Sequence, residues 1–551
     1  MQVLIIFSSY FLILFSIVGY GNIFSKLLKR SLSLSELGFY GLIILILISY
    51  ITNFFVAHNY LHNTLLFLIG IISFTFFILE KNFDKKLLIL TLVVFAILFI
   101  GILMHKNHDD FFYYHFAYTI SLIEQKKIIG LGHLESGFRT PSSIFYLNSL
   151  FYLPFVKLSL INIGAIYYMG FSNIFFLEKI FYYLKKKQTN FILFLSLASL
   201  LIVNTAFYRI AEHGTDRSAL ILIFVLVLVY LKSLEYSKLL DRKKLLISYE
   251  NILVLILLII SLKSFYIIYI SILLVWLIQL RSILFKQNLF IELIKNKFTF
   301  LFIFSLFIFV LTVFLNTSCL VYPASFTCFE SLEWSIPVQQ VEAMKDWYSL
   351  WSKAGANPNF RTADPELYLS NLNWFMNWLE TYFFTKMSDY LGIVIFVSLI
   401  CYFFLKNKKE KNLTNDLKHF KIFYIFIILL FTEWFLNHPS LRYGGYTVVA
   451  LLIFLPLCVH ISNYSMYTEK LKKIIFFLII IPFLIFFSKN IKRINSEIDK
   501  YNYKPFQNPH YHIVDNAYYF NKRLKYYDEV RKKTDKRFYL ILSIPFKNTN
   551  K

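Results

Sequence analysis

Long apolar stretches alternate with short polar connections along the chain, a pattern typical of a protein that crosses a membrane many times. About 14 stretches approach the roughly 20 apolar residues that a helix needs to cross a bilayer. They are 2–20, 37–56, 61–79, 87–104, 162–183, 191–208, 218–236, 250–263, 265–280, 298–316, 388–405, 420–436, 444–461 and 472–488. The pattern therefore predicts an all-α polytopic membrane protein with about 14 transmembrane helices.

The lysines and arginines of the connections predict the orientation of the bundle, because positive charge gathers in cytoplasmic loops. Placing the basic connections 21–36 and 80–86 in the cytoplasm puts the N-terminus and the stretch 105–143 outside. If 144–160 crossed the membrane, the lysine cluster 185–187 would also lie outside. We therefore expect 144–160 to lie flat on the outer surface as an interfacial helix.

The same pattern divides the chain into six segments, and two of them are large outer loops. The segments are an N-terminal four-helix membrane segment 1–104, a first large outer loop with interfacial helices 105–161, central membrane helices 162–316, an outer loop with aromatic interfacial helices 317–387, C-terminal membrane helices 388–488 and a small outer tail 489–551. Within the second loop, Cys319 and Cys328 lie close together in sequence, and outside a bacterial inner membrane such a pair can oxidise. We predict that they form a disulfide; the alternative is two free thiols.

Composition agrees with a membrane protein and excludes a nucleic-acid partner. The 551 residues are 58% hydrophobic and only 16% charged, whereas soluble proteins carry about 25% charged residues. The formal net charge is +24, but in a membrane protein this excess sits in loops beside anionic headgroups. The sequence has no zinc-finger spacing, no glycine-rich phosphate loop and no basic helix with base-reading residues.

Ionisable and aromatic residues that suit acid/base or metal chemistry fall in the predicted outer connections. Four groups stand out: His108, Asp109, Asp110 and His115; Arg209, Glu212, His213, Asp216 and Arg217; Lys263; and His438, Arg442 and Tyr443, just beyond the intramembrane Glu433. Adjacent carboxylates flanked by histidines suit proton transfer or metal binding. Because all four groups share one predicted side, we expect them to form one site. Taken alone, each group could instead be an exposed loop charge or a snorkelling anchor.

The order of these groups resembles the GT-C superfamily of membrane glycosyltransferases, which includes protein O-mannosyltransferases and the aminoarabinose transferases of lipid A. The resemblance rests on HDDFFYYH at 108–115, TPSSIFYLNSLFYLP at 140–154, the stretch from Arg209 to Asp216, Lys263, and Arg442-Tyr443. The spacing to Asp216 is longer than usual in that superfamily, and the tail has no recognisable type. The segments HDDFFYYHF and SGFRTPSSIFYLNSLFYLP are also similar to a family of uncharacterised polytopic bacterial membrane proteins.

The GT-C resemblance implies transfer of a sugar from a polyprenyl-phosphate donor to an acceptor glycan, lipid or protein outside the membrane. It implies a multi-pass protein of the bacterial inner membrane, surrounded by membrane lipids, with its site on the periplasmic side. The implied catalytic residues are Asp109, Asp110 and Asp216, and we expect Asp109 to be the general base. The implied substrate-binding residues are His108, His115, Arg139, Arg209, His213, Lys263, Arg442 and Tyr443. A divalent metal, Mn or Mg, would bind at Asp109, Asp216 and His213.

Two other functions fit the same sequence. A transporter or flippase of lipid-linked glycans would use the same polar groups for binding, and broken helices with repeat symmetry would favour it. A polysaccharide polymerase or ligase would match the size of the chain, but loop 317–387 contains no histidine and only one arginine, Arg361. The remaining alternative is a structural scaffold without enzymatic or transport activity.

Overall fold

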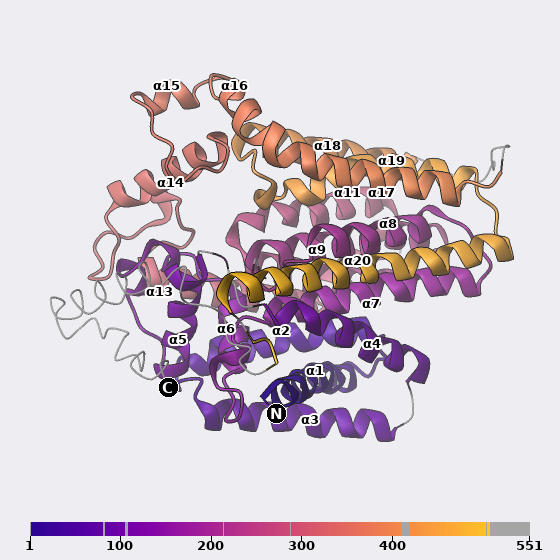
Figure 1. The fold of residues 1–551 in the computed structure, drawn as a ribbon, viewed down its shortest axis with the longest axis horizontal. Helices are drawn as coiled ribbons and strands as arrows, with labels where there is room; N and C mark the ends of the chain where they lie inside the picture. Colours follow the sequence, from indigo (N-terminus) through magenta and orange to yellow (C-terminus); the bar gives the residue numbers. More distant parts are fainter. Residues whose placement is uncertain are drawn as a thin grey trace.

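Long helices run side by side to form one bundle, with short helices and loops gathered at one end (Figure 1). This structure is a computed structural model, and it describes residues 2–80, 83–104, 108, 110–212, 214–286, 288–408, 418–502 and 504–506. In this part of the chain, almost all regular structure is helical. We call the end that carries residues 108, 110–163, 207–212, 318–374 and 438–444, together with Lys263 beside Asp216, the loop end.

Each predicted span corresponds to a helix. The helices are α1 (Gln2–Leu27), α2 (Leu34–Asn53), α3 (Tyr60–Leu79), α4 (Lys85–Leu98), α7 (Gly164–Lys185), α8 (Phe191–Ala206), α9 (Gly214–Lys238), α10 (Arg242–Leu262), α11 (Ile270–Lys286), α13 (Lys297–Thr317), α17 (Ser388–Leu405), α18 (Lys418–Asn437), α19 (Gly445–Asn463) and α20 (Glu469–Tyr501). Among the described residues, 12 helical segments are long and apolar enough to cross a membrane. The two predicted spans that do not qualify are α7, which carries Glu178 and Lys179, and α8, which has 16 residues. The prediction of a multi-pass membrane protein is thus confirmed.

Polar residues at the helix ends explain where the long helices begin. Ser33 caps α2 in a capping box with Glu36, in which each side chain accepts a hydrogen bond from the other residue's backbone N–H. Asp241 accepts from Lys244 N at the start of α10, and Thr468 accepts from Leu471 N at the start of α20. These caps bound the apolar runs.

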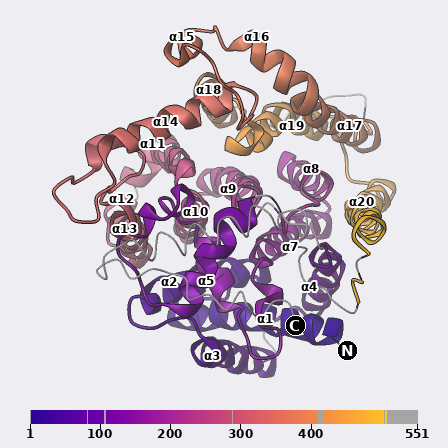
Figure 2. The same cartoon turned by 60° about the vertical axis from the view of Figure 1, so that its left-hand side comes forward.

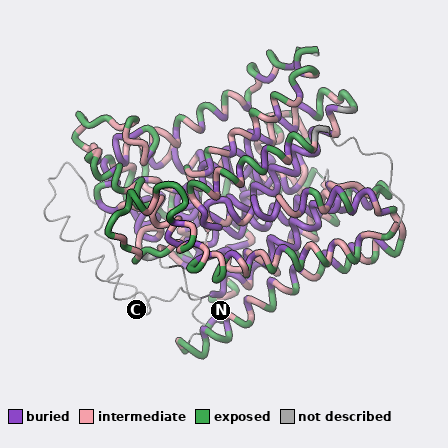
Figure 3. Tube along the Cα trace, turned by 90° about the horizontal axis from the view of Figure 1, so that it is seen from above, coloured by how far each residue is buried: buried purple, intermediate pink, exposed green. Residues whose placement is uncertain are grey.

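Helix α9 lies at the centre of the bundle. In its most apolar stretch, 94% of residues are buried, compared with 28% for α3 and α18, which lie on the outside. Figure 3 shows the buried residues running through the middle of the long helices and the exposed residues outside and at the ends. Because α9 is central, its first turn, which carries Asp216, lies at the middle of the loop end.

Short helices cover the loop end (Figure 2). They include the π-helical turn η2 (Phe111–His115), α5 (Phe116–Glu124), α6 (Ser143–Leu150), the 3₁₀ turns η6 (Ser264–Tyr269) and η9 (Leu441–Tyr443), and α14 (Val338–Lys353), α15 (Pro365–Leu369) and α16 (Phe375–Trp378) of the second large loop. A further short helix, α12 (Leu289–Ile294), lies between α11 and α13, and the π-helical segment η8 (Leu379–Met387) joins α16 to α17.

The stretch 144–160 differs from the interfacial helix that the sequence predicts. Its helix, α6, has only eight residues, about 12 Å of rise, which is far less than the roughly 30 Å of a hydrocarbon core. All eight residues are buried, so α6 is a packed core element and not a helix on the surface. The 3₁₀ turn η5 (Leu158–Leu160) then leads into α7.

Candidate active site

Four charged side chains that are far apart in sequence meet at the loop end. Asp216 lies in the first turn of α9, Lys263 directly follows α10, Arg442 lies in η9, and Asp110 directly precedes η2. Arg442 Nε donates to Asp216 Oδ2 at 2.8 Å, and Arg442 Nη2 lies 3.7 Å from Asp110 Oδ2. Lys263 Nζ pairs with the other oxygen of Asp216. We call Asp110, Asp216, Lys263 and Arg442 the charged cluster.

The charged cluster is closed on one side and accessible on the other. The side chain of Asp216 is 9% exposed, whereas those of Asp110 and Arg442 are 30% and 32% exposed. His108 lies on the accessible side, with its Nδ1 atom 3.3 Å from Asp110 Oδ2. A ligand would therefore contact Asp110 and Arg442 first, whereas the more buried Asp216 would hold the cations in position.

Local backbone structure fixes the position of Arg442. Gly444, two residues later, has a φ of +109°, a conformation that side chains with a Cβ rarely adopt, and it allows the turn between η9 and α19. Tyr266 of η6 donates from its hydroxyl to the backbone oxygen of Arg442 at 2.6 Å. The turn that carries the Arg442 guanidinium is thus fixed by Gly444 and by the hydrogen bond from Tyr266.

Charge and burial act in opposite directions on groups of the cluster that lie outside the membrane-spanning helices of the structure, such as Asp110 and Lys263. Burial raises the pKa of Asp110, but the hydrogen bond and charge of His108 and the charge of Arg442 outweigh it, so the pKa lies well below its usual range. Burial lowers the pKa of Lys263, and the neighbouring carboxylate of Asp216 counteracts this only in part. Asp110 is therefore an ionised partner of Arg442 and a weak Brønsted base.

His115 is a neutral imidazole beside the cluster. Burial is the largest effect on it and lowers its pKa to about 4, although Asp110 raises it. Its ring lies 4.3 Å from that of Tyr114 and 4.9 Å from that of Phe145. Within the described structure its Nε2 atom is buried without a hydrogen-bond partner. Such an atom is costly unless a ligand or water satisfies it.

Aromatic rings form a wall around the two cations. Lys263 Nζ lies 4.7 Å from the centre of the Tyr443 ring, and the guanidinium of Arg442 lies 5.3 Å from that of Trp351. Trp351 belongs to α14 and meets Tyr443 edge-on at 5.7 Å. Phe265 packs on Tyr443 at 4.9 Å. The second large loop thus contributes part of the site, and cation–π contacts hold both cations in place.

Arg139 holds the second large loop in place instead of pointing into the cluster. Its guanidinium donates to Gly132 O at 3.1 Å, to Tyr322 Oη at 2.9 Å and to Gln340 Oε1 at 3.2 Å. Tyr322 lies inside the short loop closed by the disulfide that joins Cys319 to Cys328. These contacts favour a positioning role for Arg139 over the substrate contact that the sequence predicts.

Arg209 also lies in a separate network. It pairs with Glu212, its Nε atom 3.0 Å from Glu212 Oε2, and the buried Glu212 pairs in turn with Arg493 near the end of α20. Asn490 of the same helix donates to the backbone oxygen of Tyr208 at 3.3 Å. The predicted outer tail therefore begins as a continuation of α20, whose end holds the connection between α8 and α9.

Two predicted site residues, Asp109 and His213, lie outside the described residues, so their predicted roles stay predictions. Both belong to the predicted metal site. Among the described residues, no group of three or more His, Cys, Asp or Glu side chains is arranged to hold a metal ion. The remaining predicted ligand, Asp216, is engaged by two cations.

The site residues predicted from the sequence did not include the aromatic side chains Trp351, Phe265 and Tyr266. The Nη1 atom of Arg217, the residue after Asp216, is buried without a hydrogen-bond partner within the described structure. The sequence placed Arg217 in the same group of outer residues as Asp216, without assigning it a role. The aromatic residues gave no signal, because the chain has 63 phenylalanines and 39 tyrosines.

One comparison with known proteins gives a match. The model of a family described as "Domain of unknown function (DUF8201)" matches residues 3–449. No curated protein and no solved structure matches the chain significantly. The match includes the whole charged cluster.

Proposed function

Because this chain belongs to the DUF8201 family, whose description states no activity, we propose a function from the site itself: an integral-membrane glycosyltransferase of the GT-C type. It would move a sugar from a polyprenyl-phosphate donor to an acceptor glycan, lipid or protein. The observation that carries this proposal is the convergence of Asp110, Asp216, Lys263 and Arg442 at one end of an apolar bundle.

The charges of the cluster fit a phosphate-linked donor. Arg442 and Lys263 are the two kinds of cation that bind phosphate, the first through a planar fork and the second as a point charge. Arg217 adds a guanidinium nitrogen without a partner in the described structure. The surrounding apolar helices would hold the polyprenyl chain at the depth of the bilayer, so the lipid-linked phosphate and the cations would meet near the membrane surface.

The proposed reaction displaces a phosphate at the first carbon of the sugar. An acceptor hydroxyl oxygen attacks this carbon, the bond between the carbon and the phosphate oxygen breaks, and polyprenyl phosphate leaves with the electron pair. The hydroxyl proton goes to a carboxylate, for which we propose Asp109. Arg442 and Lys263 stabilise the charge that develops on the phosphate, and Asp216 holds both cations in position.

His115 would contribute a neutral hydrogen-bonding atom. Its unpartnered Nε2 lies in the same π-helical turn that follows Asp110, and π-helical turns often occur at functional sites. An imidazole without charge can bind a sugar or acceptor hydroxyl without competing for the phosphate. We further propose that the loop end faces the periplasm of a bacterial inner membrane, because the basic connections lie at the other end.

The test uses the full chain in proteoliposomes that contain a panel of polyprenyl-phosphate sugars and acceptor lipids. Released polyprenyl phosphate is measured, because every donor sugar would yield it. We expect release by the wild-type protein and by Arg361→Gln, an exposed arginine of the second large loop, and loss of release with Arg442→Gln.

A different outcome would identify the main alternative. Movement of the intact sugar-phosphate lipid between leaflets, without released polyprenyl phosphate, would replace the proposal with a transporter. Equal release by Arg442→Gln and the wild type would exclude the charged cluster as the site of transfer.

A further inference from the structure

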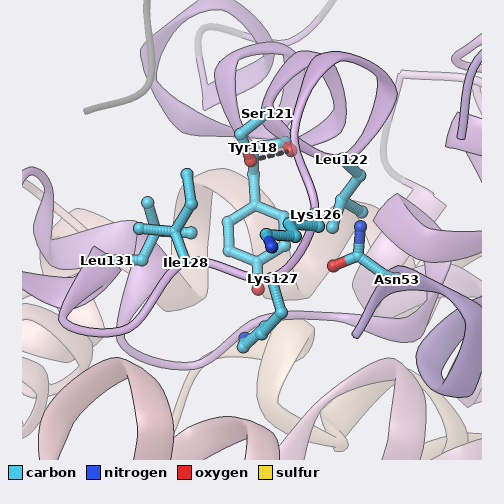
Figure 4. Close-up of a pocket in the computed structure, with 8 residues that line it drawn as sticks. All are labelled: Asn53, Tyr118, Ser121, Leu122, Lys126, Lys127, Ile128 and Leu131. Carbon is cyan, nitrogen blue, oxygen red and sulfur yellow. Dashed lines mark hydrogen bonds between the residues drawn. The ribbon is translucent and has the colours of Figure 1, made fainter. Parts of the chain in front are cut away.

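A small pocket opens at the loop end between the end of α2, the helix α5 and the connection that follows α5 (Figure 4). About 180 Å³ of empty space lies within it, part of which is open to solvent. Its lining residues are Asn53, Tyr118, Ser121, Leu122, Lys126, Lys127, Ile128 and Leu131. None of them belongs to the charged cluster.

Two polar groups that line the pocket, Asn53 Oδ1 and the ammonium group of Lys127, lack a hydrogen-bond donor and a counter-charge, respectively, in the described structure. Asn53 Oδ1 is buried and has no hydrogen-bond partner within the described structure, while its Nδ2 atom donates to Gln125 O at 3.1 Å. Lys127 Nζ donates to a neutral amide, Asn316 Oδ1, at 2.8 Å. In the described part of the chain, neither Lys126 nor Lys127 forms an ion pair with a carboxylate. The pocket therefore offers positive charge and one free acceptor.

The backbone around the pocket is tied at three points. Lys127 N donates to Asn53 O at 2.7 Å, and Gly130 N donates to Leu315 O at 2.8 Å. Asn316 Nδ2 donates to Phe138 O at 2.8 Å, which fixes the amide that receives the lysine. The polar groups are therefore held in place before a ligand arrives, and a preorganised site loses less affinity to ordering.

The surroundings of Lys127 show that its charge is not compensated. Burial lowers the pKa of its ammonium group to about 7, and among the described residues no neighbouring charge raises it. A bound anion would supply the missing counter-charge. Figure 4 shows the oxygen of Asn53 on the side of the pocket that faces both lysines.

We propose that this pocket binds a phosphate group carrying a neighbouring hydroxyl. The phosphate would lie against Lys127 and the exposed Lys126, and the hydroxyl would donate to Asn53 Oδ1. Two sources share this chemistry: the headgroup of phosphatidylglycerol and a free glycerol phosphate.

The experiment uses the full chain in nanodiscs, with binding measured by native mass spectrometry and by thermal unfolding. One arm compares nanodiscs of phosphatidylglycerol with nanodiscs of phosphatidylcholine. The other arm adds glycerol 3-phosphate to the phosphatidylcholine nanodiscs. Retention or stabilisation in the first arm identifies the lipid headgroup, and in the second arm alone it identifies the free phosphate.

Substitutions of the lining lysines test whether the ligand binds in this pocket. Lys127→Met should weaken the affinity for the ligand about tenfold or more, since a hydrogen bond to a charged group contributes about 1.5–3 kcal/mol. Lys126→Glu changes an exposed side chain, so it tests the pocket even if Lys127→Met fails to fold. Lys345→Met, an exposed lysine of α14, is the matched control and should bind like the wild type. Absence of binding in both arms, or equal binding by all variants, would overturn the proposal.

Discussion

Replacing Asp216 with asparagine would leave Lys263 and Arg442 without their shared counter-charge. Breaking a fully buried ion pair in this way costs about 3–5 kcal/mol. The cations keep 24% and 32% of their side-chain exposure, so water screens part of this loss. We therefore expect Asp216→Asn to lower the free energy of unfolding by about 2–4 kcal/mol, less than a fully buried pair would lose.

The assay is thermal unfolding in detergent, followed by the fraction of protein that remains monodisperse after heating. The exposed Asp389→Asn is the matched control, because it removes the same charge from the surface. Asp216→Asn should lower the free energy of unfolding by less in a Lys263→Met background, because one of the two cations left without a counter-charge is then absent. Equal unfolding temperatures for Asp216→Asn and Asp389→Asn would show that the ion pairs of the cluster do not stabilise the fold.

Four further predictions concern the candidate site and the second large loop. Asp109→Asn should reduce sugar transfer by about 10²–10⁴-fold, and Asp110→Asn by less, with protein levels in the membrane unchanged; equal activity of both variants with the wild type would reject the proposed base. Thermal stability should fall as the pH decreases from 7 toward 4, because the unfolded state then protonates His115 while burial holds its folded pKa at about 4; His115→Gln should flatten this pH dependence. Trp351→Ala should raise the KM for the donor by about 2–30-fold and Trp351→Phe by less, as expected if the ring supports Arg442; an unchanged KM would remove Trp351 from the site. Replacing both Cys319 and Cys328 with serine should lower stability by about 2–3 kcal/mol, the cost of opening a loop with a sequence separation of 9, and unchanged melting would show that the bridge constrains little.

The bundle could be predicted from the sequence because a membrane imposes a simple rule on helix length. Each apolar stretch became a helix, and capping residues such as Ser33 and Asp241 mark their beginnings. The stretch 144–160 could not be predicted in the same way. Its hydrophobicity fits a surface helix and a buried helix equally well, and only its packing in the structure places α6 inside.

The members of the charged cluster could be named from the sequence, but their pairings could not. Asp110, Asp216, Lys263 and Arg442 stood out as charges beside apolar spans, where charges are costly and therefore informative. Arg139 met the same criterion, but in the structure it holds the second large loop in place. Its partners Tyr322 and Gln340 lie about 200 residues away in the sequence. Such distant contacts leave no local pattern in the sequence.

The central claim is that the charged cluster breaks a bond between sugar carbon and phosphate oxygen, and one isotope measurement tests it directly. A polyprenyl-phosphate sugar carrying ¹⁸O at the bridging position is supplied to the protein in proteoliposomes, and the lipids are analysed by mass spectrometry. We expect polyprenyl phosphate that retains ¹⁸O, together with an acceptor that gains the sugar without ¹⁸O, and neither product with Arg442→Gln. A donor recovered intact, or ¹⁸O found in the acceptor, would contradict the proposed reaction.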